Sequence, residues 1–220
     1  MVPEARLEET PEGLRPAGAG WFVMNAQEAA WRDRPGRGRS LPLGGWSEEE
    51  RRELFPQLGM ALYVLEPGEP IGVYHWEADQ EGFLVLYGQA LLLVEGQERE
   101  LRQWDFVHCP PGAKHIIIGA GDGPCGVLAV SSREHIDENV NGGGYAVDET
   151  AKRHGVSVEE ETSDVAEAYA RFDDPVNARY RGLATGLGLV AESGADGART
   201  RDLRAASATL SQLSYSPTAG

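Results

Sequence analysis

Three residues with metal-binding side chains lie close together in the segment from Gly72 to Gly88: His75, Glu77 and Glu81. If this segment runs as one extended strand, the three residues have the same parity and their side chains point to one face. One imidazole and two carboxylates buried together are unfavourable unless they are paired. A divalent cation satisfies all of them, so the spacing predicts a metal site.

A second segment, from Trp104 to His115, supplies a further candidate ligand. Its Pro110-Pro111-Gly112 turn is rigid and delivers His115 onto the following strand. Two such segments on adjacent strands can furnish both sides of one metal site, with the candidate ligands His75, Glu77, Glu81 and His115.

The two segments resemble the two sequence motifs of the cupin superfamily. Cupin motif 1 has His, any residue, His, three or four residues, Glu, six residues and Gly, and it is matched by His75, Glu81 and Gly88. Motif 2 is matched by Pro110, Gly112 and His115. The resemblance covers about residues 57–133. The phrases HWEADQEGFLVL and WDFVHCPPGAKH are also similar to uncharacterised bacterial single-domain cupins.

The chain departs from the cupin pattern at three positions. Glu77 stands where the family has its second His, Trp104 replaces the Gly of motif 2, and Gly119 replaces its Asn. With Glu77 as a fourth ligand, the shell of two His and two carboxylates is harder than the family's usual one and favours Mn, Fe or Ni, with Zn competing. Alternatively, Glu77 stays off the metal and acts as a catalytic general base, or has a structural role.

Neighbouring residues have structural interpretations beside functional ones. His108 either supports the metal ligands, lines the pocket mouth or simply packs. Cys109 is expected to be a buried apolar residue rather than a nucleophile, and Gln80 should face away from Glu81 in a regular strand. The barrel interior is expected to be apolar and aromatic, lined by Tyr63, Phe83, Val85, Tyr87 and Phe106.

Short strands are the elements that would position these residues. Between Gln57 and Arg133, strand-like runs alternate with Gly and Pro turn signals at near-regular spacing, which is typical of an antiparallel sandwich or barrel. Together with the resemblance, this pattern predicts an all-β protein: an antiparallel double-stranded β-helix (cupin or jelly-roll barrel) with short flanking helices.

Helix signals flank the strand-rich region. Ser47 and Glu50 have capping-box spacing, so a short helix is expected there. Two further helices are predicted, over about residues 148–154 and from Asp164, after a flexible break at 141–144. The last helix presents an apolar stripe that must pack on its own barrel or on a second subunit, formed by Val165, Tyr169 and Phe172.

Composition suggests four regions. Residues 1–20, rich in Pro, Gly and Glu, are expected to form a flexible arm. Residues 21–135 would hold the barrel and an N-terminal extension, and 136–180 a helical extension. A Gly-, Ala- and Ser-rich tail over 181–220 is expected to be disordered.

The chain of 220 residues has a formal net charge of -15, from 35 acidic and 20 basic residues, which disfavours nucleic acid as a partner. The longest apolar run is too short to cross a bilayer, so no membrane partner is expected. The N-terminus lacks the apolar stretch of a signal peptide. The only cysteines, Cys109 and Cys125, form no paired motif. A cytoplasmic location is therefore expected.

Three functions fit these features. The first is a metalloenzyme, of dioxygenase or isomerase type, acting on a small oxygen-bearing organic molecule bound in the barrel. The second is a non-catalytic protein that binds or senses a small molecule or metal, and the third is a metal-free structural module. Phosphorylated substrates are disfavoured because few basic residues lie near the motifs; Arg102 and Lys114 are the exceptions. A homodimer is expected from the extra helices and the resemblance.

Overall fold

The computed structural model describes residues 1–135 and 142–182, which all belong to the first of two compact units of the chain, Met1–Leu187. Residues 136–141, at the start of the predicted helical extension, lie outside the described residues. The predicted tail also lies outside them, except for Arg181 and Gly182.

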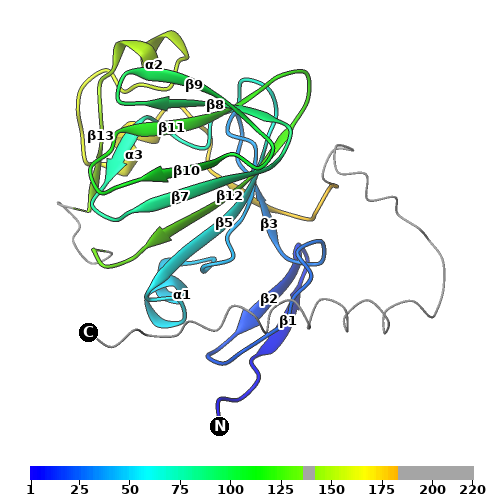
Figure 1. Ribbon diagram of the computed structural model, residues 1–220. Helices are drawn as coiled ribbons and strands as arrows, with labels where there is room; N and C mark the ends of the chain where they lie inside the picture. The colour runs from blue at the N-terminus through cyan, green and yellow to red at the C-terminus, as the bar shows by residue number, and fades with distance from the viewer. Residues whose placement is uncertain (136–141, 183–220) are drawn as a thin grey trace, which may run out of the picture. The chain divides into compact units, whose positions relative to one another are not determined.

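Within the described ranges, the strands form three antiparallel sheets (Figure 1). The largest has seven strands in the order β10 (Phe106–Cys109), β7 (Glu81–Tyr87), β12 (Cys125–Ser132), β5 (Leu58–Leu65), β4 (Arg39–Leu41), β3 (Trp31–Asp33) and β14 (Val176–Ala178). The second has five, in the order β13 (Gly143–Tyr145), β6 (His75–Glu77), β11 (His115–Ala120), β8 (Gln89–Val94) and β9 (Gln97–Arg102). The third is a hairpin of β1 (Arg6–Thr10) and β2 (Gly13–Ala17).

The main hydrophobic core lies between the two larger sheets. Strand β7 shows the alternation that builds it: Phe83 and Val85 are buried, while Leu84 and Leu86 between and after them are only partly covered. Both sheets contribute to the core cluster, with Leu65, Phe83, Val85 and Val127 from one and Leu92, Leu101 and Ile117 from the other. This arrangement confirms the predicted all-β antiparallel fold with few short helices.

Two glycines are required by close backbone approach. Gly88 joins β7 to β8 with φ +74, and a Cβ there would lie 2.6 Å from the Pro124 carbonyl oxygen. At Gly119, a Cβ would lie 2.2 Å from the Glu66 carbonyl oxygen. The backbone of residue 66 therefore explains why this chain has Gly where cupin motif 2 has Asn.

Residues 1–20, predicted to form a flexible arm, contain the β1–β2 hairpin. Gly13 allows the β1–β2 turn with φ +137, and its closeness to Ala29 leaves no room for a side chain. The hairpin is tied down because Leu14 exchanges backbone hydrogen bonds with Glu28 and Ala30, at 2.7 and 3.1 Å. The Pro- and Gly-rich composition here reflects a tight turn rather than a linker.

In the described residues, three helices are present, at the three places where the sequence predicted them. Ser47 and Glu50 form a capping box at α1 (Glu48–Glu53). Side chains of Asp148 and Asp164 cap α2 (Glu149–Arg153) and α3 (Val165–Tyr169). None of the helices in the described residues is both long and apolar enough for a membrane crossing.

The C-terminal extension also contains strands. Gly143 and Gly144, expected in a flexible break, lie in β13 and pair with Glu77 and Trp76 of β6. A Cβ on Gly143 would lie 2.8 Å from the Trp76 carbonyl oxygen, so the glycines permit close strand contact rather than disorder.

The apolar stripe of α3 packs on its own barrel. Tyr169 and Phe172 cover the buried Val73, whereas Val165 is exposed. This helix therefore does not depend on a second subunit to cover its aromatic residues.

Candidate metal centre

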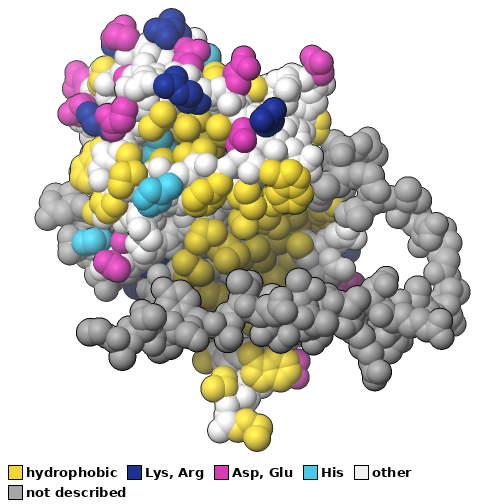
Figure 2. Space-filling model, in the orientation of Figure 1, with side chains coloured by type: hydrophobic (Ala, Val, Ile, Leu, Met, Phe, Trp, Pro, Cys, Tyr) yellow, Lys and Arg dark blue, Asp and Glu magenta, His cyan; other side chains and the backbone are white. Residues whose placement is uncertain are grey.

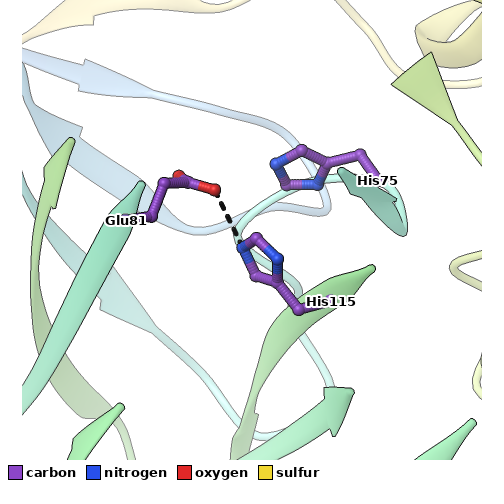
Figure 3. A group of neighbouring side chains, drawn as sticks. All are labelled: His75, Glu81 and His115. Atoms are coloured by element: carbon purple, nitrogen blue, oxygen red, sulfur yellow. Dashed lines mark ion pairs between the residues drawn. The ribbon is translucent and has the colours of Figure 1, made fainter. Parts of the chain in front are cut away.

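Three strands bring His75, Glu81 and His115 together (Figure 3). His75 of β6 and His115 of β11 are direct partners across neighbouring strands of the five-stranded sheet. Glu81 begins β7 in the opposite sheet. The expectation of one continuous strand from residue 72 to 88 is therefore wrong. Residues 78–80 cross between the sheets, and Glu81 reaches the site from the other wall of the barrel.

The three side chains form a compact group. One possible ligand atom from each lies within 4.8 Å of the others. His115 Nε2 lies 3.1 Å from Glu81 Oε2, and the two imidazole ring centroids are 4.9 Å apart. His115 is 1% exposed and the Glu81 side chain 12%. Imidazole nitrogens and a carboxylate oxygen at this spacing are the donor set of a two-His, one-carboxylate metal site.

Backbone carbonyls fix the orientation of both imidazoles. Nδ1 of His75 lies 2.8 Å from the Val73 carbonyl oxygen, and Nδ1 of His115 lies 2.9 Å from that of Ala113. A carbonyl can only accept, so each Nδ1 carries the proton and donates it. In the neutral rings, Nε2 is then left with its lone pair directed into the site, as a metal ligand requires.

This orientation creates an electrostatic problem that a cation solves. Glu81 Oε2 and His115 Nε2 are both buried and have no hydrogen-bond partner, although they face each other. Burial opposes a charge on His115, but Cys109 and the Glu81 carboxylate outweigh burial and raise the pKa of His115 to about 10. Burial and then His115 lower the pKa of His75. Either a proton or a metal ion must therefore lie between His115 and Glu81.

Glu77 lies at the edge of this group. Its Oε1 is 3.8 Å from His75 Nε2, and its side chain is 37% exposed. Burial and the charge of Glu81 raise the pKa of Glu77 to about 8. Among the described residues, the close ligand group contains His75, Glu81 and His115 without Glu77. A fourth-ligand role for Glu77 remains a prediction.

Two cavities meet at the site. The first, which we call the inner chamber, has a volume of about 180 Å³; it is lined by all three ligands and by Tyr63, Phe83 and Tyr169. The second, the outer cavity, has a volume of about 590 Å³ and is bordered by Arg51, Arg52 and Arg133. Both cavities are lined by Tyr63, His75, Glu77, Glu81 and Ala129. A small ligand could thus approach the metal ligands through the outer cavity.

Of the remaining candidate residues, some line the chamber or the core and others are exposed. Tyr63 and Phe83 line the inner chamber, as expected. Cys109 is buried in the core, opposite Glu81 on the neighbouring strand. The side chains of His108 and Phe106 are exposed, so neither lines the barrel interior.

Sequence reasoning missed Arg34, which lines the inner chamber. The dipeptide Pro35-Gly36 beside it is a turn signal, but nothing in that signal places the turn against the barrel opening. Few basic residues lie near the two motifs in the sequence, but the fold brings Arg34 close to them.

Residues 61–131 match the sequence profile described as the cupin domain. No curated protein matches the chain. Among solved structures, a sugar phosphate isomerase of the cupin superfamily from Silicibacter pomeroyi is 28% identical, with 43% of this chain and 59% of that chain covered and a TM-score of 0.38. A cupin 2 domain-containing protein from Halorhodospira halophila is 21% identical, with coverages of 43% and 63% and a TM-score of 0.38.

A DMSP lyase from Ruegeria pomeroyi is 25% identical, with 36% of this chain and 40% of that chain covered and a TM-score of 0.32. The chain thus spans less than two thirds of each of these three structures. The matched segment contains His75, Glu81 and His115, and it forms the walls that carry them. Residues 61–131 of this chain are a cupin domain.

Proposed function

We propose that the chain is a metalloenzyme. In this proposal His75, Glu81 and His115 hold one divalent transition metal ion (Mn, Fe, Ni or Zn), and a small oxygen-bearing organic molecule binds beside it in the inner chamber. The observation that carries the proposal is the buried pair of Glu81 Oε2 and His115 Nε2, which face each other at 3.1 Å and need a positive charge, a proton or a metal ion, between them. A cation held there would satisfy both atoms.

When bound, such a metal supplies Lewis-acid polarisation of a ligand oxygen or a site for oxygen chemistry. The protein contributes the orientation of the two imidazoles and an apolar lining for the chamber. The Val73 and Ala113 carbonyls hold the imidazoles in place, and the buried Phe83 and Ile117 give the inner chamber part of its apolar lining. Glu77 borders both cavities and is placed to take or return a proton from the bound molecule. This position favours isomerase-type proton transfer.

Glu77→Gln is expected to keep the metal and to lose proton transfer. The substitution preserves side-chain size but removes the basic oxygen, and Glu77 lies outside the close ligand group. We expect metal content within about twofold of wild type and proton transfer at least about 100-fold slower. Elemental analysis gives the first quantity. Loss of the metal in Glu77→Gln would instead make Glu77 a ligand.

The enzyme assignment is tested by proton exchange and oxygen uptake. Metal-loaded protein is incubated in D₂O with small hydroxyketones, hydroxyacids and ketoacids, and deuterium incorporation is followed by NMR. We expect exchange in the wild type and none in a Glu81→Gln variant that has lost the metal. Metal-loaded wild type that shows neither exchange nor oxygen uptake would favour the alternative, a non-catalytic binding protein.

We also propose that the chain forms a homodimer through the outer face of the seven-stranded sheet. Register pairs align Phe106, Leu84 and Leu128 in one row across β10, β7 and β12. Phe106 and Trp104 are 66% and 67% exposed. Figure 2 shows hydrophobic side chains gathered over this part of the sheet. Exposed aromatic residues on such a face are characteristic of interface centres.

The backbone conformation of Trp104 also favours a dimer interface on this face of the sheet. Trp104 has φ +73, a conformation that favours glycine, and cupin motif 2 has Gly at this position. Such a backbone conformation costs about 1–3 kcal/mol in a residue other than glycine. Because the Trp104 side chain is also exposed, the cost indicates a role outside the monomer's own fold. An anchor in the dimer interface is such a role.

Phe106→Glu is expected to weaken the dimer at least about tenfold, because a charge would be buried at the interface centre. Light scattering after size exclusion at two protein concentrations measures the change. Val176→Glu is the matched control, because Val176 is also an exposed apolar strand residue but lies on β14, at the opposite edge of this sheet from β10. A wild type that is monomeric at both concentrations would remove the proposal.

A further inference from the structure

Arg34 is held rigidly at the end of β3. Its carbonyl oxygen accepts a hydrogen bond from the Arg37 amide at 2.7 Å, and its own amide donates to the Gly38 carbonyl oxygen at 2.9 Å. Pro35 and Gly36, with φ +70 at Gly36, occupy the central positions of the turn. These positions suit a type II turn, which fixes the direction in which Arg34 leaves the backbone.

The guanidinium of Arg34 is only partly satisfied by the protein. Nη2 donates to the Ile71 carbonyl oxygen. The guanidinium carbon lies 5.1 Å from the centroid of the Tyr63 ring, which places the group over that ring. Nη1 is buried and has no hydrogen-bond partner among the described residues. Over the same residues, no salt bridge joins Arg34 to a carboxylate.

This arrangement differs from that of a structural arginine in the same protein. Arg133 is also partly buried, but its terminal nitrogens donate to the carbonyl oxygens of Arg51, Phe55 and Gly44. Arg34 has one such acceptor and a second nitrogen left over. A buried N–H of an always-charged group without an acceptor is destabilising, so it persists where a ligand can supply the acceptor.

The position of Arg34 indicates where such a ligand would bind. Arg34 lines the inner chamber together with His75, Glu81 and His115. With a divalent ion held by two neutral imidazoles and Glu81, the chamber would carry one excess positive charge before Arg34 is counted. Arg34 adds a second and Glu77, when ionised, removes one. The balance is a net positive chamber that attracts an anion.

We infer that the inner chamber binds a small carboxylate, with its carboxylate group on Arg34 and a second oxygen-bearing group directed to the metal ligands. This inference rests on the proposed metal site. The planar guanidinium matches a carboxylate in shape and charge. The chamber volume of about 180 Å³ holds a small organic acid. Pockets for drug-sized ligands begin at roughly 300 Å³.

The test compares 3-hydroxypropionate with 3-hydroxypropanamide, which replaces the only carboxylate by a neutral amide of similar shape and keeps the hydroxyl for the metal. Binding to zinc-loaded wild-type protein is measured by calorimetry, and the metal content of each sample is measured in parallel. We expect 3-hydroxypropionate to bind at least about tenfold more tightly than 3-hydroxypropanamide, because the charge-assisted contact with Arg34 is lost with the amide. Equal affinities in metal-loaded wild type would overturn the inference without any substitution.

Arg34→Gln is expected to reduce this preference to about twofold or less while metal content stays at the wild-type level. Arg34→Lys keeps the charge but loses the planar pair of N–H donors that matches a carboxylate, so an intermediate preference is expected. Arg32→Gln is the matched control. Arg32 lies in β3, two residues before Arg34, and also donates to a backbone carbonyl oxygen, that of Trp46, but it lines neither cavity.

The outcomes separate this inference from the metal site on which it rests. If wild type takes up no metal, the metal site fails first. If metal is retained in Arg34→Gln and the preference for 3-hydroxypropionate over its amide is unchanged, Arg34 does not bind the carboxylate and the inference is wrong. Thermal unfolding of each variant verifies that a lost preference does not reflect a lost fold.

Discussion

His115→Ala is expected to reduce bound metal from about one ion per chain to less than about a tenth of that. His115 is almost completely buried, its Nε2 faces Glu81 Oε2 at 3.1 Å, and its Nδ1 is already held by the Ala113 carbonyl oxygen. Removing the ring deletes one of three ligand atoms. Loss of supporting groups around metal ligands already costs about 10–100-fold in affinity, so loss of a ligand should cost more. Elemental analysis of tag-free protein measures the content.

His108→Ala is the matched control, because His108 lies in the same sequence motif but is exposed on β10. Its metal content should equal that of wild type. Glu81→Gln should behave like His115→Ala, because the amide keeps the side-chain size and loses the charge. Equal metal content in His115→Ala and wild type, with the fold verified by circular dichroism, would exclude the site.

Removal of the metal is expected to lower the melting temperature by roughly 8–16 °C. The metal binds the assembled site, whose ligands come from β6, β7 and β11, and the unfolded chain does not hold them together. A ligand at about 1,000 times its Kd stabilises the native state by about 4 kcal/mol. In a chain of this size, each kcal/mol shifts Tm by about 2–4 °C. Thermal unfolding with added metal and with excess chelator measures the difference.

The same comparison in His115→Ala should show little difference between metal and chelator. Any remaining shift would come from metal bound elsewhere, for example on the acidic surface, and its size sets the background for the wild-type value. A wild-type shift no larger than that of His115→Ala would show that metal does not stabilise this fold through the proposed ligands.

The group of candidate metal ligands could be predicted from sequence because motif spacing encodes it. His75, Glu81 and His115 stand at fixed distances from the turns around Gly88 and Gly112. The route by which they meet could not be predicted. Strand parity predicted that His75 and Glu81 share one face of a single strand, but residues 78–80 carry the chain from one sheet to the other, and the two side chains meet from opposite walls. Local periodicity contains no information on which sheet a strand joins.

Glycine-rich composition predicted linkers at positions where the glycines lie in a strand or a hairpin. Gly13 and the pair Gly143-Gly144 suggested linkers, and in the structure they permit close backbone packing. Phe106 illustrates the opposite error, since its hydrophobicity suggested the barrel interior. Its register with Leu84 places it on the outer face instead.

Arg34 could not have been identified at all. It lies 41 positions before His75 in a turn with ordinary turn chemistry. Only the pairing of β3 with β4 and of β4 with β5 brings that turn beside Tyr63 and the inner chamber. Long-range pairing of this kind determines the chamber's charge, while the motifs determine its metal ligands.

Anomalous scattering from crystals of the metal-loaded wild-type protein, recorded on both sides of the metal's absorption edge, locates the bound ion. We expect one strong peak per chain, about 2.0–2.2 Å from His75 Nε2, His115 Nε2 and a carboxylate oxygen of Glu81. The same map shows whether Glu77 approaches the ion. A loaded crystal with no peak between these three residues, or with its peak elsewhere on the chain, would contradict the metal centre described here.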